Sequence, residues 1–214
     1  MKQPTDFAKY ISRFLNDYLT NEKGVSKNTI KSYSYTFILF IKFMDEVKKT
    51  HINRLSLKDI TKEAVVDFLD WIQNIRNCSD STRNQRLAAI ASFIRYVEYM
   101  DPAVLYKYHQ ILSIPVKKTE RKLISYLTVD GVKLLLQQPN VVKGKGLRDL
   151  TLLSLMYESA ARVQEIIDIT PSSLHLESKP YRVILYGKGN KNRSVPLPEK
   201  EVQILKQHMN QYEL

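Results

Sequence analysis

Four stretches in the first half of the chain repeat apolar residues at intervals of three and four, the spacing that lines one face of an α-helix. In the second stretch, for example, Ile30, Phe37 and Met44 fall on one stripe. The four stretches are residues 6–19, 26–47, 61–75 and 81–100. Because four amphipathic helices of this length can enclose a single hydrophobic core, we expect a helical domain over residues 1–112 and interpret the apolar stripes as packing surfaces.

The helical pattern stops at Pro115, because proline interrupts a helix. The residues that follow are strongly basic, because Lys117, Lys118, Arg121 and Lys122 are accompanied by a single acid, Glu120. Residues 113–125 are therefore predicted to form a basic linker between two domains. Such a charge run is usually only solvated, although in a basic protein it can also lie along a phosphate backbone.

Residues 126–214 mix helical and strand patterns, which predicts a smaller unit of the α+β class. Helices are expected within residues 128–139, 146–169 and 199–214. Apolar and polar residues alternate from Tyr181 to Tyr186 as in a half-buried strand, and a second strand resumes at Ser194. The whole chain is thus expected to be mainly α with a small β-hairpin or sheet.

The turn of this hairpin is rich in glycine and positive charge. Gly187 and Gly189 permit the backbone angles of a turn, which places Lys188 at the hairpin tip. The order of residues differs from that of a nucleotide-binding phosphate loop, so ATP binding is not expected. The hairpin is either an ordinary charged loop or an arm whose lysine enters a nucleic-acid groove and delivers a proton or a charge, with Lys191 and Arg193 close by.

The net charge narrows the choice of partner. The chain carries 33 Lys and Arg against 22 Asp and Glu, a formal charge of +11. This excess favours a polyanion, although many soluble proteins are basic only for solubility. No apolar run approaches the roughly 20 residues of a membrane-spanning helix, and the N-terminus lacks the apolar core of a signal peptide. We therefore expect a nucleic acid rather than a membrane as partner, and a cytoplasmic location.

The single cysteine, Cys78, excludes an internal disulfide and a zinc site built from several cysteines.

Arg162 and Glu165 are candidates for a functional site. They stand one helical turn apart in an apolar region and can form an ion pair. A buried arginine held by a glutamate is a structural motif as often as a functional one. The guanidinium fork also matches the oxygens of a reacting phosphate.

Two of the expected helices start alike, at Ser26 and at Ser81, each with threonine, asparagine and basic residues in its first turns. Helix N-termini offer free N–H groups to phosphate, although ordinary N-capping of a solvated helix explains either start alone. Together the two starts favour DNA. The candidate DNA contacts are Lys27, Asn28, Thr29, Lys31, Tyr33, Arg83, Asn84, Arg86, Lys191 and Arg193.

These stretches together resemble the tyrosine recombinases, or phage integrase family. Residues 26–44 and 81–97 are similar to two helices of the family's N-terminal core-binding domain, and residues 126–136 to the start of its catalytic domain. Residues 159–166 resemble the family's first arginine box, and residues 187–197 resemble its lysine hairpin. The resemblance covers nearly the whole chain.

The resemblance implies a four-helix, SAM-like core-binding domain over residues 1–112 and the first part of an α+β catalytic domain over residues 126–214. It also implies DNA strand cleavage and rejoining through a 3′-phosphotyrosyl intermediate, without a metal or other cofactor. The implied partner is a double-stranded recombination site bound by a homo-tetramer. In that chemistry Arg162 binds the scissile phosphate, Glu165 holds Arg162, and Lys188 protonates the leaving 5′ oxygen.

The sequence departs from the family pattern at two places. Ala160 stands where the family usually has glycine, and we expect a tighter local turn because alanine tolerates a helix better. The family's His-x-x-Arg box and tyrosine nucleophile have no match, because His208 is followed by Met-Asn-Gln and Tyr212 comes too early and reads as a helix residue. We therefore expect a C-terminally truncated recombinase that binds DNA without cutting it, exposes apolar surface around residues 150–156 and self-associates to some extent.

Three other classes of protein stay open. A type IB topoisomerase shares the chemistry, but the helical N-terminal domain favours a recombinase. A DNA-binding-only regulator, or a competitor of a full-length recombinase, would end naturally at Leu214. A basic helical scaffold without a nucleic-acid partner would not bind duplex DNA even at low salt.

Overall fold

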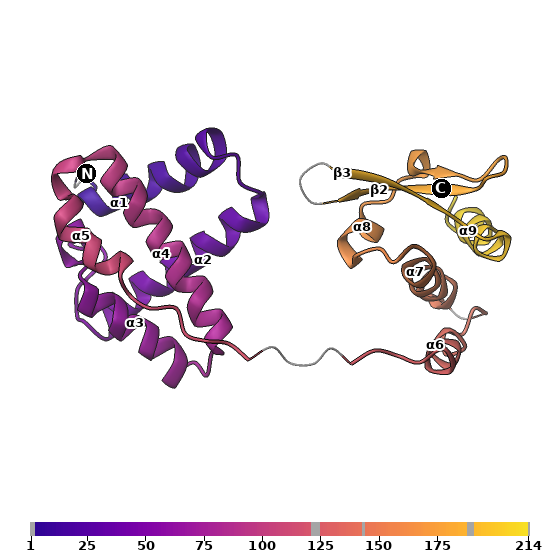
Figure 1. Cartoon of the computed structure of the whole chain (residues 1–214), viewed down its shortest axis with the longest axis horizontal. Helices are drawn as coiled ribbons and strands as arrows, with labels where there is room; N and C mark the ends of the chain where they lie inside the picture. Colours follow the sequence, from indigo (N-terminus) through magenta and orange to yellow (C-terminus); the bar gives the residue numbers. More distant parts are fainter. Residues whose placement is uncertain (1–2, 121–124, 143, 188–190, 214) are drawn as a thin grey trace. The chain divides into compact units, whose positions relative to one another are not determined.

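The computed structural model describes residues 3–120, 125–142, 144–187 and 191–213. The chain divides into two compact units, Met1–Lys122 and Leu123–Leu214 (Figure 1). Each unit has a hydrophobic core of its own. The described residues of the first unit form helices joined by turns and irregular segments, and the second unit combines helices with a small sheet, so the expected fold class is confirmed.

The first helix of unit 1 runs without a break into a wider π-helical segment. Thr5 caps its start, because the Thr5 hydroxyl accepts a hydrogen bond from the Ala8 amide. None of the helices in the described ranges is long and apolar enough to cross a bilayer. The elements are α1 (Asp6–Arg13), η1 (Phe14–Glu22), α2 (Lys27–Glu46), η2 (Leu57–Asp59), α3 (Lys62–Asn74), α4 (Asp80–Met100), η3 (Pro102–Val104) and α5 (Leu105–Leu112).

Aromatic rings fill the centre of unit 1. Phe14 of η1 is fully buried and meets Phe93 of α4 edge to face, with ring centroids 5.4 Å apart. Phe37 of α2 meets the same ring at 5.2 Å. Edge-to-face pairs add to the stabilisation that burial itself gives. The apolar stripes predicted from the sequence are therefore confirmed as packing surfaces.

A fifth helix, α5, belongs to this core and was not predicted from the sequence. Pro102 opens the short turn η3 that leads into it. Tyr108 is buried, and its hydroxyl donates a hydrogen bond to the carbonyl oxygen of Leu57 at 2.9 Å. Ile111 and Ile114 are buried as well. The core of unit 1 thus extends past the four predicted helices as far as the start of the expected linker.

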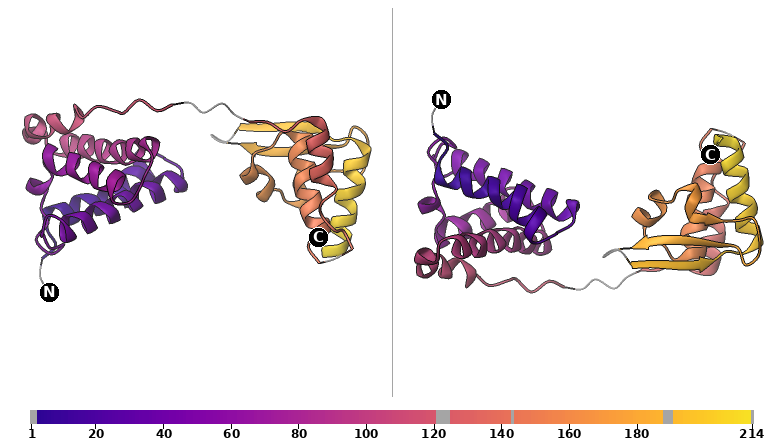
Figure 2. Two further views of the ribbon diagram at one scale, coloured as in Figure 1. Left: turned by 90° about the horizontal axis from the view of Figure 1, so that it is seen from below. Right: turned by 90° about the horizontal axis from the view of Figure 1, so that it is seen from above.

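Unit 2 packs helices against a three-stranded antiparallel sheet in the order β1-β2-β3 (Figure 2). The predicted hairpin is confirmed, with Gly187 opposite Lys191 at its turn end. Val183 and Leu185 of β2 are fully buried and share a core with Leu155 of α7 and Leu205 of α9. Lys188, the expected tip, lies outside the described residues. The elements are α6 (Val129–Leu136), α7 (Gly146–Ser159), α8 (Val163–Ile167), η4 (Pro171–Ser173), β1 (Leu174–His175), β2 (Arg182–Gly187), β3 (Lys191–Pro196) and α9 (Glu199–Tyr212).

Candidate functional site

A sharp turn between α7 and α8 carries the predicted arginine. Helix α7 ends at Ala160, whose φ of 48° and ψ of 35° are left-handed. The sequence predicted a tighter turn here because alanine tolerates a helix, but Ala160 ends the helix in the left-handed conformation that glycine adopts most easily. Arg162 is extended and forms the N-cap of α8. Arg162 therefore lies between the two helices in sequence and belongs to the regular part of neither.

Glu165 lies in α8 and accepts two hydrogen bonds from Arg162. Its Oε2 accepts a hydrogen bond from the Arg162 backbone N–H at 2.9 Å, and its Oε1 accepts one from Arg162 Nη1 at 2.7 Å. The sequence indicated a buried arginine, and the structure corrects this. The side chain of Arg162 is 74% exposed, whereas that of Glu165 is only 4% exposed. The buried glutamate thus presents the arginine to solvent.

Arg193 of β3 binds the same carboxylate. Its Nη1 donates to Glu165 Oε1 at 3.1 Å and its Nη2 to Glu165 Oε2 at 2.8 Å, while Nη2 also reaches the Ala160 carbonyl at 3.3 Å. The hydrogen bonds from Arg193, followed by the bond from the Arg162 backbone, lower the pKa of Glu165 to about 2. The carboxylate is therefore ionised at every physiological pH, and two arginines against one glutamate leave one net positive charge.

The turn end of the hairpin closes against this carboxylate. A Cβ atom added to Gly187 would lie 3.2 Å from Glu165 Oε1 and 3.2 Å from the Lys191 carbonyl. A side chain at position 187 would thus be crowded by these two oxygens, and glycine permits the close approach of the strand to the carboxylate. Lys191 is exposed at the start of β3. The structure thus brings together Arg162, Glu165 and Arg193, which span 32 residues of sequence.

The start of α2 in unit 1 displays part of the predicted DNA surface. Ser26 caps the helix, because its hydroxyl accepts a hydrogen bond from the Thr29 amide at 3.3 Å. The Thr29 hydroxyl lies 3.0 Å from that of Ser26 and belongs to the cap. Lys27, Asn28 and Lys31 are exposed around it. These three side chains are free to meet a phosphate backbone.

Tyr33 does not join this surface. It packs against the core of unit 1, and its ring is nearly parallel to that of Phe14, with centroids 6.4 Å apart. Position 33 lies on the packing face of the helix with its side chain half-buried, and the DNA contact predicted for Tyr33 stays a prediction.

The start of α4 lies two residues earlier than the sequence indicated. Ser79, not Ser81, caps the helix, and its hydroxyl accepts a hydrogen bond from the Thr82 amide at 3.3 Å. The serine and threonine are again three residues apart, as at the start of α2. The likeness between the two helix starts is therefore real, but Asp80 places an acid in the first turn of α4.

Arg83 and Asn84 hold the chain that follows α5. Arg83 is 5% exposed and donates a hydrogen bond to the Pro115 carbonyl at 3.2 Å. Asn84 exchanges two hydrogen bonds with the backbone of Lys117, at 2.8 and 3.0 Å. Arg83 is thus not displayed as predicted, because its guanidinium is used inside unit 1. The first residues of the expected linker are fixed to α4 by these contacts.

Arg86 links α4 to α2. Its Nη1 donates to the Ser32 carbonyl at 3.2 Å and to the Thr36 hydroxyl at 3.1 Å, and its guanidinium lies 4.9 Å from the centre of the Tyr35 ring. Together with Lys31 it lines a shallow surface hollow. The side chain is held rigidly beside the exposed start of α2, where it contributes positive charge.

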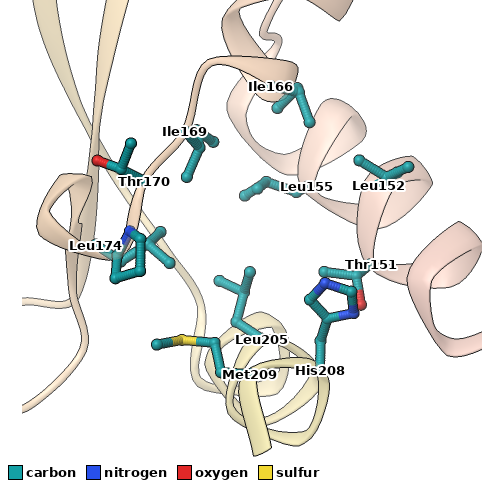
Figure 3. A pocket seen from close by; sticks show the side chains of 11 residues that line it. Thr151, Leu152, Leu155, Ile166, Ile169, Thr170, Leu174, Leu205, His208 and Met209 are labelled. Atoms are coloured by element: carbon teal, nitrogen blue, oxygen red, sulfur yellow. The ribbon is translucent and has the colours of Figure 1, made fainter. Parts of the chain in front are cut away.

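A mostly apolar hollow of about 140 Å³ opens between α7, the segment after α8, and α9 (Figure 3). His208 lines it, and burial lowers the pKa of its imidazole. The expectation of exposed apolar surface around residues 150–156 is met at Leu152, which is 37% exposed, whereas Leu155 is buried. Tyr212 is a helix residue, as predicted; it ends α9, and its ring centroid lies 4.8 Å from that of His208.

Comparison with known proteins identifies the family. The phage integrase family profile matches residues 125–213, and the profile of the phage integrase N-terminal SAM-like domain matches residues 11–98. A putative integrase/recombinase, y4rD, of Sinorhizobium fredii is 31% identical over 192 residues, which cover 90% of this chain and 68% of that protein. The chain belongs to the phage integrase family, the tyrosine recombinases.

Two further comparisons agree with this assignment. Tyrosine recombinase XerD of Staphylococcus epidermidis is 32% identical over 200 residues, which cover 91% of this chain and 62% of that protein. The crystal structure of XerH site-specific recombinase bound to difH substrate, a pre-cleavage complex, matches all of this chain and 71% of that one with a TM-score of 0.66 and 19% identity. The latter shows likeness of fold. The chain thus spans about two thirds of the length of these proteins.

Proposed function

We propose that the protein is a site-specific DNA recombinase or integrase that cleaves and rejoins DNA through a 3′-phosphotyrosyl intermediate. The observation that carries this proposal is the Arg162–Glu165–Arg193 cluster. It combines an exposed guanidinium, a buried carboxylate and one net positive charge near the turn end of the hairpin whose sequence includes Lys188. A guanidinium fixed in advance suits a reaction that depends on positioning and on neutralising the charge of phosphate oxygens.

In this reaction a tyrosine oxygen attacks the scissile phosphorus and the bond to the 5′ oxygen breaks. Arg162 binds the non-bridging oxygens, Glu165 holds Arg162, and Lys188 gives its proton to the leaving 5′ oxygen. The 5′ hydroxyl of a second strand then attacks the phosphotyrosine and releases the enzyme. The bond energy is kept in the protein–DNA link, so the proposed reaction needs no nucleotide cofactor.

We further propose that the 214 residues by themselves bind duplex DNA and do not cut it. Arg162 and Lys188 match the family's motifs, but the residues after His208 do not supply the second arginine or the nucleophile. Unit 1 contributes the exposed charges at the start of α2, including Lys27 and Lys31. The double-stranded site, a homo-tetramer on that site and a cytoplasmic location are part of the same proposal.

The proposal is tested by measuring the affinity of the chain for a labelled 30-base-pair duplex at several salt concentrations. Binding through several lysines and arginines predicts that the logarithm of the affinity falls linearly with the logarithm of salt, by about 0.9 per phosphate contacted. A chain that fails to bind at low salt would be the basic scaffold instead.

A DNA-binding regulator is the second candidate, because the box at His208 lacks its arginine. The coding DNA beyond codon 214 separates the two. An open frame with His-x-x-Arg followed by a tyrosine supports the recombinase. A stop codon supports the regulator and removes the catalytic role of Lys188.

A further inference from the structure

Arg193 donates three hydrogen bonds in the cluster, against two from Arg162, yet the proposed reaction gives it no task. We propose that Arg193 is a positioning residue, which fixes the Glu165 carboxylate so that Arg162 is aimed at the phosphate. Through the same contacts it couples that arginine to the hairpin that bears Lys188. This inference rests on the proposed function, which it deepens.

The contacts of Arg193 are directed inward. Its two terminal nitrogens form parallel hydrogen bonds with both oxygens of Glu165, at 3.1 and 2.8 Å, and one of them also reaches the Ala160 carbonyl. Ala160 at the end of α7 and Glu165 within α8 are thereby both bound to β3. A bidentate arginine–carboxylate pair fixes orientation as well as distance. Arg193 therefore sets both the carboxylate and the left-handed turn that precedes Arg162.

Arg162 is placed differently. Its side chain is 74% exposed, against 39% for Arg193. Only its Nη1 donates to Glu165 in the described contacts, so the outer edge of the guanidinium faces solvent. The single buried carboxylate neutralises one of the two arginines. The remaining positive charge is thus carried at the exposed member, where an incoming phosphate meets it.

Both strands of the hairpin meet the same carboxylate. On β2, a Cβ at Gly187 would lie 3.2 Å from Glu165 Oε1. On β3, Arg193 pairs across the hairpin with Leu185, two residues before that glycine. A shift of the hairpin therefore moves Glu165, and through it Arg162. Gly187, the residue before Lys188, is thus linked to Arg162 through the Glu165 carboxylate.

A double-mutant cycle tests this link in the 214-residue chain with a labelled duplex at low salt. Arg162→Ala should weaken binding about tenfold in the wild-type background, since charge-assisted hydrogen bonds are involved. In the Arg193→Gln background the same change should weaken binding less than about twofold, because Arg162 is no longer aimed. Arg193→Lys should also lose most of the coupling, since an ammonium cannot reproduce the fork.

Arg182→Gln is the matched control. Arg182 is exposed on β2 at the open end of the hairpin, opposite Pro196. In this background Arg162→Ala should keep its full effect. Thermal unfolding of each variant shows whether unit 2 is still folded.

A spectroscopic measurement tests the geometry without DNA. The pKa of Glu165, observed by ¹³C NMR of its carboxyl group, should rise from about 2 when Arg193 is changed to Gln, and should not move in Arg182→Gln. An unmoved Glu165 pKa, full coupling in Arg193→Lys, or equal effects of Arg162→Ala in all backgrounds would overturn the positioning role while leaving DNA binding intact. A wild-type chain that binds no duplex would overturn the proposed function and this inference together.

Discussion

Arg193 on β3 donates two hydrogen bonds to the carboxylate of Glu165 on α8, which lies 28 positions earlier in the sequence. The carboxylate in turn holds Arg162, whose guanidinium faces solvent. A residue on a strand thus determines where an arginine on a helix cap points. The turn that carries Arg162 and the hairpin strand β3 are thus joined through one buried carboxylate.

The left-handed turn at Ala160 is strained, because a Cβ atom disfavours a positive φ. Ala160→Gly should therefore stabilise unit 2 by about 0.5–1 kcal/mol, measured as a higher urea midpoint. The same exchange at Ala88, exposed within α4, should destabilise unit 1 by about 1 kcal/mol. A loss of stability in Ala160→Gly would show that the turn is not held in this conformation.

Glu201 of α9 makes the stability of unit 2 depend on pH. Burial raises its pKa to about 7, opposed by a hydrogen bond from the Ser154 hydroxyl at 3.1 Å. Because the folded-state pKa lies above the unfolded value, the stabilisation is complete below about pH 4.5 and is lost as pH rises through about 7. The loss should be at most about 3 kcal/mol.

Calorimetric unfolding between pH 5 and pH 8 measures this effect. Glu201→Gln should remove the decline with rising pH, since an amide does not ionise. Glu199→Gln, in the first turn of the same helix where Glu199 pairs with Lys179 in solvent, should leave the decline in place. A wild-type profile that is flat or rises with pH would contradict the assignment.

The exposed lysines at the start of α2 should contribute to the salt dependence of DNA binding. Changing Lys27 and Lys31 together to glutamine should lower the slope of log affinity against log salt by about 2, if each meets one phosphate. The control pair, Lys42 and Lys58, lies away from this helix start and should leave the slope nearly unchanged. An unchanged slope in the first variant would remove the start of α2 from the interface.

The apolar hollow of unit 2 predicts association between copies of the chain. Leu152 and Ile167 are 37% and 64% exposed at or beside it. Exposed apolar patches in water favour association, so sedimentation velocity should show larger species as concentration rises. Changing both residues to glutamine should reduce them, whereas Leu105→Gln on unit 1 should not. A monodisperse wild-type monomer with a sharp unfolding transition would count against this prediction.

Local sequence patterns predicted the parts of the fold that depend on local spacing. The apolar period located α2, α3 and α4, and the alternation of residues from Tyr181 located β2. Helix α5 was missed because it is short and follows a proline, and because its burial depends on a distant partner, the Leu57 carbonyl. The spacing of apolar residues predicts which face of a helix is buried, but it does not predict which distant group that face contacts.

The candidate site shows the same limit. The pairing of Arg162 with Glu165 follows from a separation of three residues, so the sequence predicted it. Arg83 donates a hydrogen bond to the Pro115 carbonyl, and Arg193 donates one to the Glu165 carboxylate. Both contacts join residues far apart in sequence, so local spacing does not predict them. Only the folded chain shows that Arg83 is buried and that Arg193 binds the carboxylate that also binds Arg162.

The most direct test of the account is to incubate the 214-residue chain with a nicked, labelled duplex and to analyse the same samples on native and denaturing gels. We predict a salt-sensitive complex on the native gel, weakened by Arg162→Ala, and no protein-linked DNA after denaturation. Protein-linked DNA would show that a nucleophile is present within these residues. The absence of any native complex at low salt would contradict the DNA-binding role itself.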